Sequence, residues 1–212
     1  MFNVNNDTNI NIFVNNLSVI LEKNAISNNS FYKYCDISVG FFYRLLKGEN
    51  ARFKFYVRIA EALNLPLCIF FYDQENNKDV LLGIVDENLN LKQTIKTIIN
   101  DEYYDNEVSL VNVTEESVAN DVDMYLNYCI VQINQKLKQN KITKLDIANG
   151  MRASVSYINN LLNGKQMPSI EMISQIARFL DIKIFDLLNV PEKFQKGVAK
   201  GKKRVAIKMQ QI

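Results

Sequence analysis

The sequence of 212 residues contains no histidine and only three cysteines. Without histidine, neither a zinc finger of the usual spacing nor a Cys-His or Ser-His-Asp catalytic group can be assembled. Cys35, Cys68 and Cys129 are odd in number and far apart, so we expect buried free thiols instead of disulfides. These absences predict a protein without a metal site and without a cofactor.

Long apolar runs and a leader segment are also missing. No run of about 18 apolar residues suggests a membrane span. Residues 1–13 lack a cationic start followed by an apolar block and a cleavage site. The carboxylates between residues 101 and 107 have neither metal-ligand spacing nor a glycine-rich phosphate loop nearby, so we expect them to be solvated surface. The sequence therefore predicts a cytoplasmic protein that is not an enzyme and has no membrane partner.

Residues 142–189 have the pattern of four short helices separated by turns. Thr143 and Ser154 are candidate N-caps, and Gly164 is a candidate C-terminal stop. A further helix is expected to begin at Pro168-Ser169. The residues expected to face inward are Leu145, Ile147, Ala148, Val155, Ile158, Leu161, Leu162, Ile170, Ile173, Ile176, Ala177, Leu180, Ile184, Leu187 and Leu188.

The helix that begins at Ser154 has a polar outer side. Ser156, Tyr157, Asn159 and Asn160 lie there. Small and amide side chains on an exposed helix add little stability, but they suit the donor and acceptor patterns of base edges.

This order of caps, small residues and stops resembles the Xre/Cro, or lambda-repressor-like, helix-turn-helix family. The resemblance covers the whole five-helix module and implies binding to double-stranded DNA. Arg152 is a departure, because the family usually has glycine in that turn. The alternative is a helical module that has kept its core pattern and lost its ligand, since a fold does not fix a function.

The first half repeats this pattern. When residues 142–189 are moved back by 116 positions, Thr143 falls on Ser27, Ser154 on Ser38 and Gly164 on Gly48. With one residue dropped, Ile176-Ala177 falls on Ile59-Ala60. Each repeat is preceded by an amphipathic helix, with inward residues Ile10, Phe13, Val14, Leu17, Ile20 and Leu21 in the first and Tyr125, Leu126, Cys129, Ile130, Ile133 and Leu137 in the second.

The first repeat departs further from the family pattern. Tyr32 replaces a small residue, so the two crossing helices must separate or the tyrosine must swing aside. Arg44 could pair with guanine, Gly40 would permit close approach to DNA, and Lys47, Arg52 and Lys54 could hold phosphates. Alternatively, Phe41 or Phe42 forms a protein interface and this copy does not read DNA.

Charge is distributed unevenly along the chain. Residues 1–72 carry seven basic and five acidic side chains, residues 73–121 three and twelve, residues 122–190 eight and five, and residues 191–212 seven and one. Neutralisation of phosphates supplies most non-specific DNA affinity, so we expect the basic segments against the duplex and the acidic segment facing away.

The middle region and the tail carry weaker signals. Residues 72–77 read as a linker, and residues 80–85 form an apolar run that ends in a turn at 86–88. Residues 89–99 suggest a strand passing into a helix, and residues 103–113 could form another strand. This favours a small subdomain or a dimerisation arm, with a regulatory pocket left open. Lys202, Lys203 and Arg204 belong to a basic arm that could follow phosphates or enter a minor groove. It could also be solvated surface, or add a strand.

Together these patterns predict a mainly α protein with lambda-repressor-like five-helix domains at residues 1–72 and 122–190, an acidic, possibly α+β, region at 73–121 and a basic tail at 191–212. The predicted function is sequence-specific binding of double-stranded DNA by a nucleoid-associated transcription regulator of prokaryotic or phage type. Recognition helices would enter the major groove, in a homodimer or a tandem pseudo-dimer. The predicted DNA contacts are Thr143, Lys144, Ser154, Val155, Ser156, Tyr157, Asn159, Asn160, Lys165, Ser38, Gly40, Tyr43, Arg44, Lys47, Arg52, Lys202, Lys203 and Arg204.

The alternative function is a protein-binding adaptor or antitoxin that holds a protein partner through residues 1–121. An exposed apolar patch on Phe41, Phe42, Phe53 and Phe55 would favour it.

Overall fold

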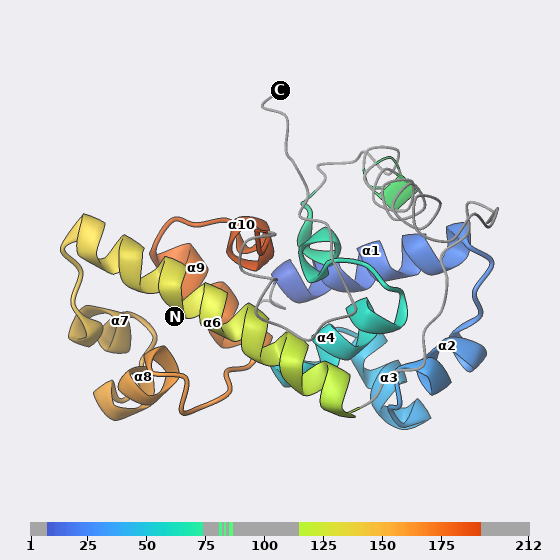
Figure 1. Ribbon diagram of the computed structural model, residues 1–212, viewed down its shortest axis with the longest axis horizontal. Coiled ribbons are helices and arrows are strands. Elements are labelled where there is room, and N and C mark those ends of the chain that lie inside the picture. The colour runs from blue at the N-terminus through green and yellow to red at the C-terminus, as the bar shows by residue number, and fades with distance from the viewer. Residues whose placement is uncertain (1–7, 74–80, 82, 84, 87–114, 192–212) are drawn as a thin grey trace.

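The computed structural model describes residues 8–73, 81, 83, 85–86 and 115–191, and the regular elements of these residues are all helices. Figure 1 shows their arrangement. The elements are α1 (Thr8–Lys23), α2 (Asn28–Tyr34), α3 (Val39–Leu46), α4 (Phe53–Ala62), the short 3-10 helix η1 (Leu67–Phe71), α6 (Glu115–Asn140), α7 (Lys144–Gly150), α8 (Val155–Leu162), α9 (Ile170–Phe179) and α10 (Ile184–Leu188). The strand and helix predicted over 89–99, the strand predicted over 103–113 and the basic residues from Lys193 onward lie outside the described residues.

The turn predicted at residues 86–88 is wrong at Asp86, the one of these positions that the structure describes. Leu81, Gly83, Val85 and Asp86 are helical, and the side chains of Leu81 and Val85 are buried. Their spacing of four residues places both on one helix face, and a short apolar run does not distinguish a strand from a buried helix.

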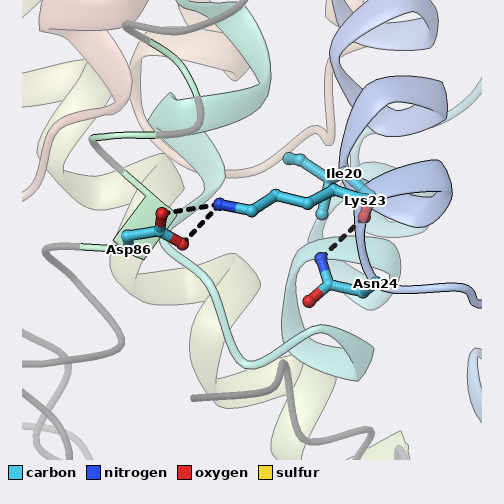
Figure 2. Close-up of polar contacts among 4 residues, drawn as sticks. All are labelled: Ile20, Lys23, Asn24 and Asp86. Atoms are coloured by element: carbon cyan, nitrogen blue, oxygen red, sulfur yellow. Dashed lines mark hydrogen bonds and ion pairs between the residues drawn. The ribbon is translucent and has the colours of Figure 1, made fainter.

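An ion pair joins this helical segment to the end of α1. The Lys23 ammonium contacts both carboxylate oxygens of Asp86 at 2.6 Å (Figure 2). The Asn24 amide, drawn beside it, donates to the Ile20 carbonyl at 2.7 Å and so satisfies an oxygen in the last turn of α1. The start of the acidic region is therefore held against the first half of the chain.

Helix α6 begins at Glu115, earlier than the predicted domain boundary at residue 122. Val118 and Val122, in its first part, are buried. The helix crosses from the second half of the chain to α4 (Figure 1). The Tyr125 hydroxyl accepts a 3.0 Å hydrogen bond from the Leu67 amide of η1, which ties α6 to the first half.

The two halves contain helices of matching length in matching order. Helices α2 and α7 have 7 residues each, α3 and α8 have 8, α4 and α9 have 10, and η1 and α10 have 5. Serine or threonine hydroxyls cap α2, α3, α7 and α8 in the same way, by accepting from a backbone amide three residues on. The backbone follows the same course of helices twice.

Backbone torsions repeat in the same register. The described residues with positive φ fall into four pairs separated by 116 or 117 positions: Ala25 and Lys141, Asp36 and Arg152, Gly48 and Gly164, and Asn64 and Asp181. Each sits at a helix end, where a left-handed residue turns the chain and lets following amides reach the last carbonyls. Arg152 therefore keeps the usual left-handed turn although it is not glycine, with φ of 51°.

Tyr32 lies in a different environment from its counterpart in the second half. Ala148, at the same place in α7, is buried, whereas Tyr32 is half-buried. The Tyr32 ring lies 6.5 Å from the ring of Phe42. Whether the crossing helices separate or the tyrosine swings aside stays a prediction.

Both halves contribute to one continuous core. Helix α10 packs on η1, α6 on α4 and α1 on α9, and the buried apolar side chains of the two halves form one cluster. The inward residues predicted for α1 and α6 are buried, except for Val14 and Ile130, which are half-buried. The division into separate domains at 1–72 and 122–190 stays a prediction.

Candidate nucleic-acid interface

Helix α7 begins with a complete capping box. The Thr143 hydroxyl accepts from the Asp146 amide at 3.2 Å, and Asp146 accepts from the Thr143 amide at 2.7 Å and from its hydroxyl at 2.6 Å. The hydrogen bonds from Thr143 hold the pKa of Asp146 below its usual value. The Thr143 hydroxyl is thus engaged in the cap, which fixes the position of the neighbouring Lys144.

Helix α8 separates a buried face from an exposed face. Ser154 caps it by accepting from the Tyr157 amide at 3.1 Å. Ile158, Leu161 and Leu162 are buried against the core, since they recur at the helical period. The caps and the buried side chains together fix which residues of α8 face outward.

The outer face of α8 carries several predicted contacts. Ser156 and Asn160 are exposed, and Val155, whose spacing predicted an inward position, is instead 38% exposed. Tyr157 and Asn159 are half-buried, and partial burial raises the pKa of Tyr157. The most outward groups are thus a methyl-bearing, a hydroxyl and an amide side chain, which suit contact with base edges.

Leu145 does not face inward as predicted. It is 54% exposed on the outer side of α7, where Ile147 and Ala148 take the buried positions. Position 145 is two residues from Ile147, which is half a helical turn, so the two cannot share one face.

The first half presents a parallel surface on α3. Ser38 caps the helix by accepting from the Phe41 amide at 3.3 Å. Gly40, Tyr43 and Lys47 are exposed, and a Cβ at Gly40 would meet no atom within 4 Å. The Tyr43 hydroxyl donates to the Asn29 side-chain oxygen at 3.0 Å. The exposed side of α3 therefore has open space beside its first turn.

Arg44 lies on the same exposed side of α3. Its guanidinium is 3.7 Å from the Glu49 carboxylate and 5.9 Å from the centre of the Phe41 ring. Both partners of this ion pair are more than half exposed, and surface pairs contribute about 0–1 kcal/mol. The guanidinium can therefore exchange Glu49 for another acceptor at small cost.

Phe41, Phe42, Phe53 and Phe55 do not form the exposed patch that would favour the adaptor hypothesis. Phe42 and Phe53 are fully buried. Phe41 and Phe55 are half-buried and pack on each other, with ring centres 4.2 Å apart. These four side chains thus offer little apolar surface to a protein partner.

The other residues predicted to contact DNA lie outside helices α8 and α3. Lys165 is exposed directly after Gly164, and Lys144 is half-buried at the start of α7. Arg52 is exposed at the N-terminus of α4, at the junction of the two halves, whereas Lys54 is half-buried with its ammonium 5.3 Å from the centre of the Phe55 ring. Lys202, Lys203 and Arg204 lie outside the described residues.

The helices that carry the predicted contacts of the second half and of the first half lie on the same side of the molecule. Figure 1 shows α7 and α8 at the lower left and α2 and α3 at the lower right. The described helical residues Leu81, Gly83, Val85 and Asp86 lie on the upper side, as α10 does, whereas the lime-coloured start of α6, also part of the acidic segment, lies lower in the view. That the acidic segment faces away from DNA stays a prediction. The candidate interface is therefore the lower side, made by α8 and α3 with the turns beside them.

Sequence reasoning missed three exposed residues near α8. Arg152 lies in the turn before α8, Asn163 is the C-cap residue of α8, and Gln166 follows three residues after Asn163. The sequence could have predicted Asn163 as a DNA contact, because it is four residues after Asn159 and so lies one turn further along the same side of the helix.

Other kinds of site find little support. Among the described residues, no group of three or more Cys, Asp or Glu side chains could hold a metal ion. The cysteines are buried and free, and burial raises the pKa of Cys68 and of Cys129 to about 12. No helix in the part of the chain that the structure describes has both the length and the apolar character needed to cross a membrane.

Comparison with known proteins identifies the second half of the chain. The helix-turn-helix family HTH_3 matches residues 133–187, which run from the last part of α6 through α7, α8 and α9 into α10. No curated protein and no solved structure matches the chain. Residues 133–187 are therefore similar to a helix-turn-helix domain of the Xre type.

Proposed function

We propose that the protein is a sequence-specific, double-stranded DNA-binding transcription regulator of prokaryotic or phage type, and that it acts at the nucleoid in the cytoplasm. The supporting observation is the outer face of α8, within the matched residues 133–187. Ser156 and Asn160 are exposed there while Ile158 and Leu161 anchor the helix in the core. Such a helix would enter the major groove with its polar side chains toward the base edges.

We further propose that the first half is a second, divergent copy of the same module. Its helix lengths, caps and left-handed turns repeat those of the second half. A Cβ on Gly150 would lie 2.6 Å from the Phe179 ring, and the first half has Tyr34 and Ala62 at these two places. The large and small side chains are exchanged between the two helices, as expected when two copies conserve core volume while diverging.

The proposed contacts divide into two kinds. Asn160 and Asn159 would read adenine, and Val155 would touch a thymine methyl. Ser154, Ser156 and Tyr157 would lie beside the bases. Backbone contacts would come from Thr143, Lys144 and Lys165, because phosphate contacts position a protein without carrying sequence information.

The first copy and the tail would also supply base contacts and phosphate contacts. Arg44 would read a guanine, with Gly40 allowing close approach of the α3 backbone. Ser38 and Tyr43 would lie beside the bases, whereas Lys47 and Arg52 would hold phosphates. The basic residues Lys202, Lys203 and Arg204 would add to the salt dependence of binding.

The test begins with selection of duplexes from random double-stranded DNA at a stated salt concentration. Affinity for the selected duplex and for an unrelated one is then measured for Asn160→Ala and Lys144→Ala. We expect Asn160→Ala to lower the affinity for the selected duplex about tenfold and to change the affinity for the unrelated duplex little. Lys144→Ala should weaken both alike and lower the salt slope by about one.

Lys183→Ala is the matched control. Lys183 is exposed at the start of α10, on the side of the molecule away from α8 (Figure 1). The Lys183→Ala substitution removes one positive charge and should leave the affinities for the selected and the unrelated duplex unchanged. If Asn160→Ala keeps the selected affinity within about threefold while Lys144→Ala weakens all sequences alike, the assignment of Asn160 to base reading is wrong.

A further inference from the structure

Equivalent residues of the two halves touch one another. Two residues are called equivalent when they occupy the same place in the two halves. Up to Gly48, the equivalent residue lies 116 positions further along the chain, and from Arg52 onward it lies 117 positions further, as the helix bounds require. By this rule Arg52 is equivalent to Ser169. These two residues form an isolated antiparallel bridge with each other. A residue meets its own equivalent in antiparallel fashion when the two copies are related by a two-fold rotation.

Two further contacts are images of one another under the same rotation. The Cys68 thiol lies 3.8 Å from the side-chain oxygen of Asn189, and the rings of Tyr72 and Phe185 are 5.6 Å apart. Cys68 is equivalent to Phe185, and Tyr72 is equivalent to Asn189. Exchanging the halves therefore turns one contact into the other.

The packing of whole helices follows the same rule. Helix η1 packs on its equivalent α10, and the contact of α4 with α6 has its counterpart in the contact of α9 with α1. An interface of this kind is self-complementary, as in a symmetric dimer of two identical chains. Here both surfaces belong to one chain, and the continuous core buries them.

The two outer faces held by this interface are chemically unlike. Val39 and Val155 are equivalent, and both are exposed. Arg44, however, is equivalent to Asn160: a guanidinium suits guanine and an amide suits adenine. The other unlike pairs are Gly40 with Ser156, Tyr43 with Asn159 and Lys47 with Asn163.

We infer that a single chain, without a second copy, occupies a two-part duplex site whose halves differ in sequence and lie at a fixed separation. The half facing α3 carries guanine where the half facing α8 carries adenine. The inference rests on the proposed DNA-binding function and specifies the class of site. Two-fold helix-turn-helix dimers read half-sites about one helical turn, or roughly 10 base pairs, apart, and we expect the same separation here.

The first test measures stoichiometry and spacing on a duplex selected from random DNA by the full chain. Native mass spectrometry should give one chain per duplex. Inserting about 5 base pairs between the half-sites turns one half to the opposite side of the duplex and should weaken binding at least tenfold. The same insertion outside the site should have no effect.

The second test assigns each half-site to its helix. Arg44→Ala should abolish the preference for guanine in one half-site and leave the adenine preference in the other. Asn160→Ala should do the reverse, and Lys183→Ala should change neither. We expect each specific loss to be about tenfold to a hundredfold in affinity.

Failure of the inference differs from failure of the proposed function. Two chains on a palindromic duplex, unchanged affinity after the central insertion, or an Arg44→Ala variant with unaltered sequence preference would each overturn the two-part site while DNA binding stands. If no duplex is enriched over random sequence, the proposed function itself fails.

Discussion

Arg58 of α4 lies beneath the turn between α2 and α3 and donates a 3.0 Å hydrogen bond to the Asp36 carboxylate. The same guanidinium nitrogen donates to the Cys35 and Asp36 carbonyls at 3.2 and 3.3 Å. Arg58 is buried, whereas the Asp36 side chain is 67% exposed. A buried cation thus satisfies the end of α2 where the chain takes a left-handed turn at Asp36, and it helps to position α3.

The first prediction concerns this support. Arg58→Met removes the donor from two backbone carbonyls, and we expect the free energy of unfolding to fall by about 3 kcal/mol. Asp36→Asn keeps the backbone contacts and removes only an exposed charge, so it should cost less than about 1 kcal/mol. Denaturant unfolding followed by circular dichroism measures both. Equal losses in the two variants would show that the carbonyl contacts do not contribute.

A second prediction concerns Ser174 of α9. Its side chain is fully buried, and its hydroxyl has no hydrogen-bond partner among the described residues. The equivalent residue in α4 is Val57. Ser174→Ala should leave stability unchanged or raise it by about 1 kcal/mol, because burial of an unpaired hydroxyl is costly.

Ser169→Ala is its control. Ser169 caps α9 by accepting a hydrogen bond from the Met172 amide at 3.2 Å. Ser169→Ala removes this cap and should lower the free energy of unfolding by about 1 kcal/mol. Thermal melts should therefore give a lower midpoint for Ser169→Ala and an unchanged or higher midpoint for Ser174→Ala. A loss of stability in Ser174→Ala as large as that in Ser169→Ala would mean that the buried hydroxyl has a partner.

A third prediction concerns alkaline pH. Burial raises the pKa of Cys68 and Cys129 from 9.0 to about 12, so the folded protein keeps protons that the unfolded chain releases. The stability contributed by these thiols is complete below pH 9 and is lost as pH rises toward 12. Unfolding at several pH values should show this fall, and Cys129→Ala should make it shallower.

Thiol labelling provides an independent check. At pH 8 a thiol reagent should label the native protein slowly and the unfolded protein fast, because the thiolate is the reactive form. Rapid labelling of any of the three cysteines in the native state would contradict the burial of that thiol.

A fourth prediction tests the coupling of the two halves. Tyr125→Phe removes the acceptor of the buried Leu67 amide and should cost about 1–2 kcal/mol. Tyr43→Phe also loses a hydrogen bond, but at an exposed site, and should cost about 0.5 kcal/mol or less. Hydrogen exchange at the Leu67 amide should rise in Tyr125→Phe. A single unfolding transition for the whole chain is expected, and two separate transitions would contradict the shared core.

Local sequence signals predicted much of the fold. Ser38, Ser154 and Thr143 cap helices where their sequence positions indicated, since a cap depends on amides only three residues away. The inward stripes of α1 and α6 followed from helical spacing alone. The turn expected at Asp86 was wrong, because Asp86 is helical and the short apolar run before it fits a buried strand and a buried helix equally well.

The candidate interface was only partly accessible to the same reasoning. Spacing placed Ser156 and Asn160 outward and also predicted an inward Leu145, which is exposed. Phe42 was a candidate for a protein interface, and the structure buries it in the core instead. Identifying which aromatic side chains are covered requires knowledge of the helices that pack over them.

The sequence alone determined the order of helices, their caps, the repeated pattern and the second-half module, because these depend on neighbours within a few residues. Only the tertiary structure decided how the halves pair. The bridge between Arg52 and Ser169 and the packing of η1 on α10 join segments more than a hundred residues apart. Such contacts depend on the complementarity of two folded surfaces, and no local pattern records which surface meets which.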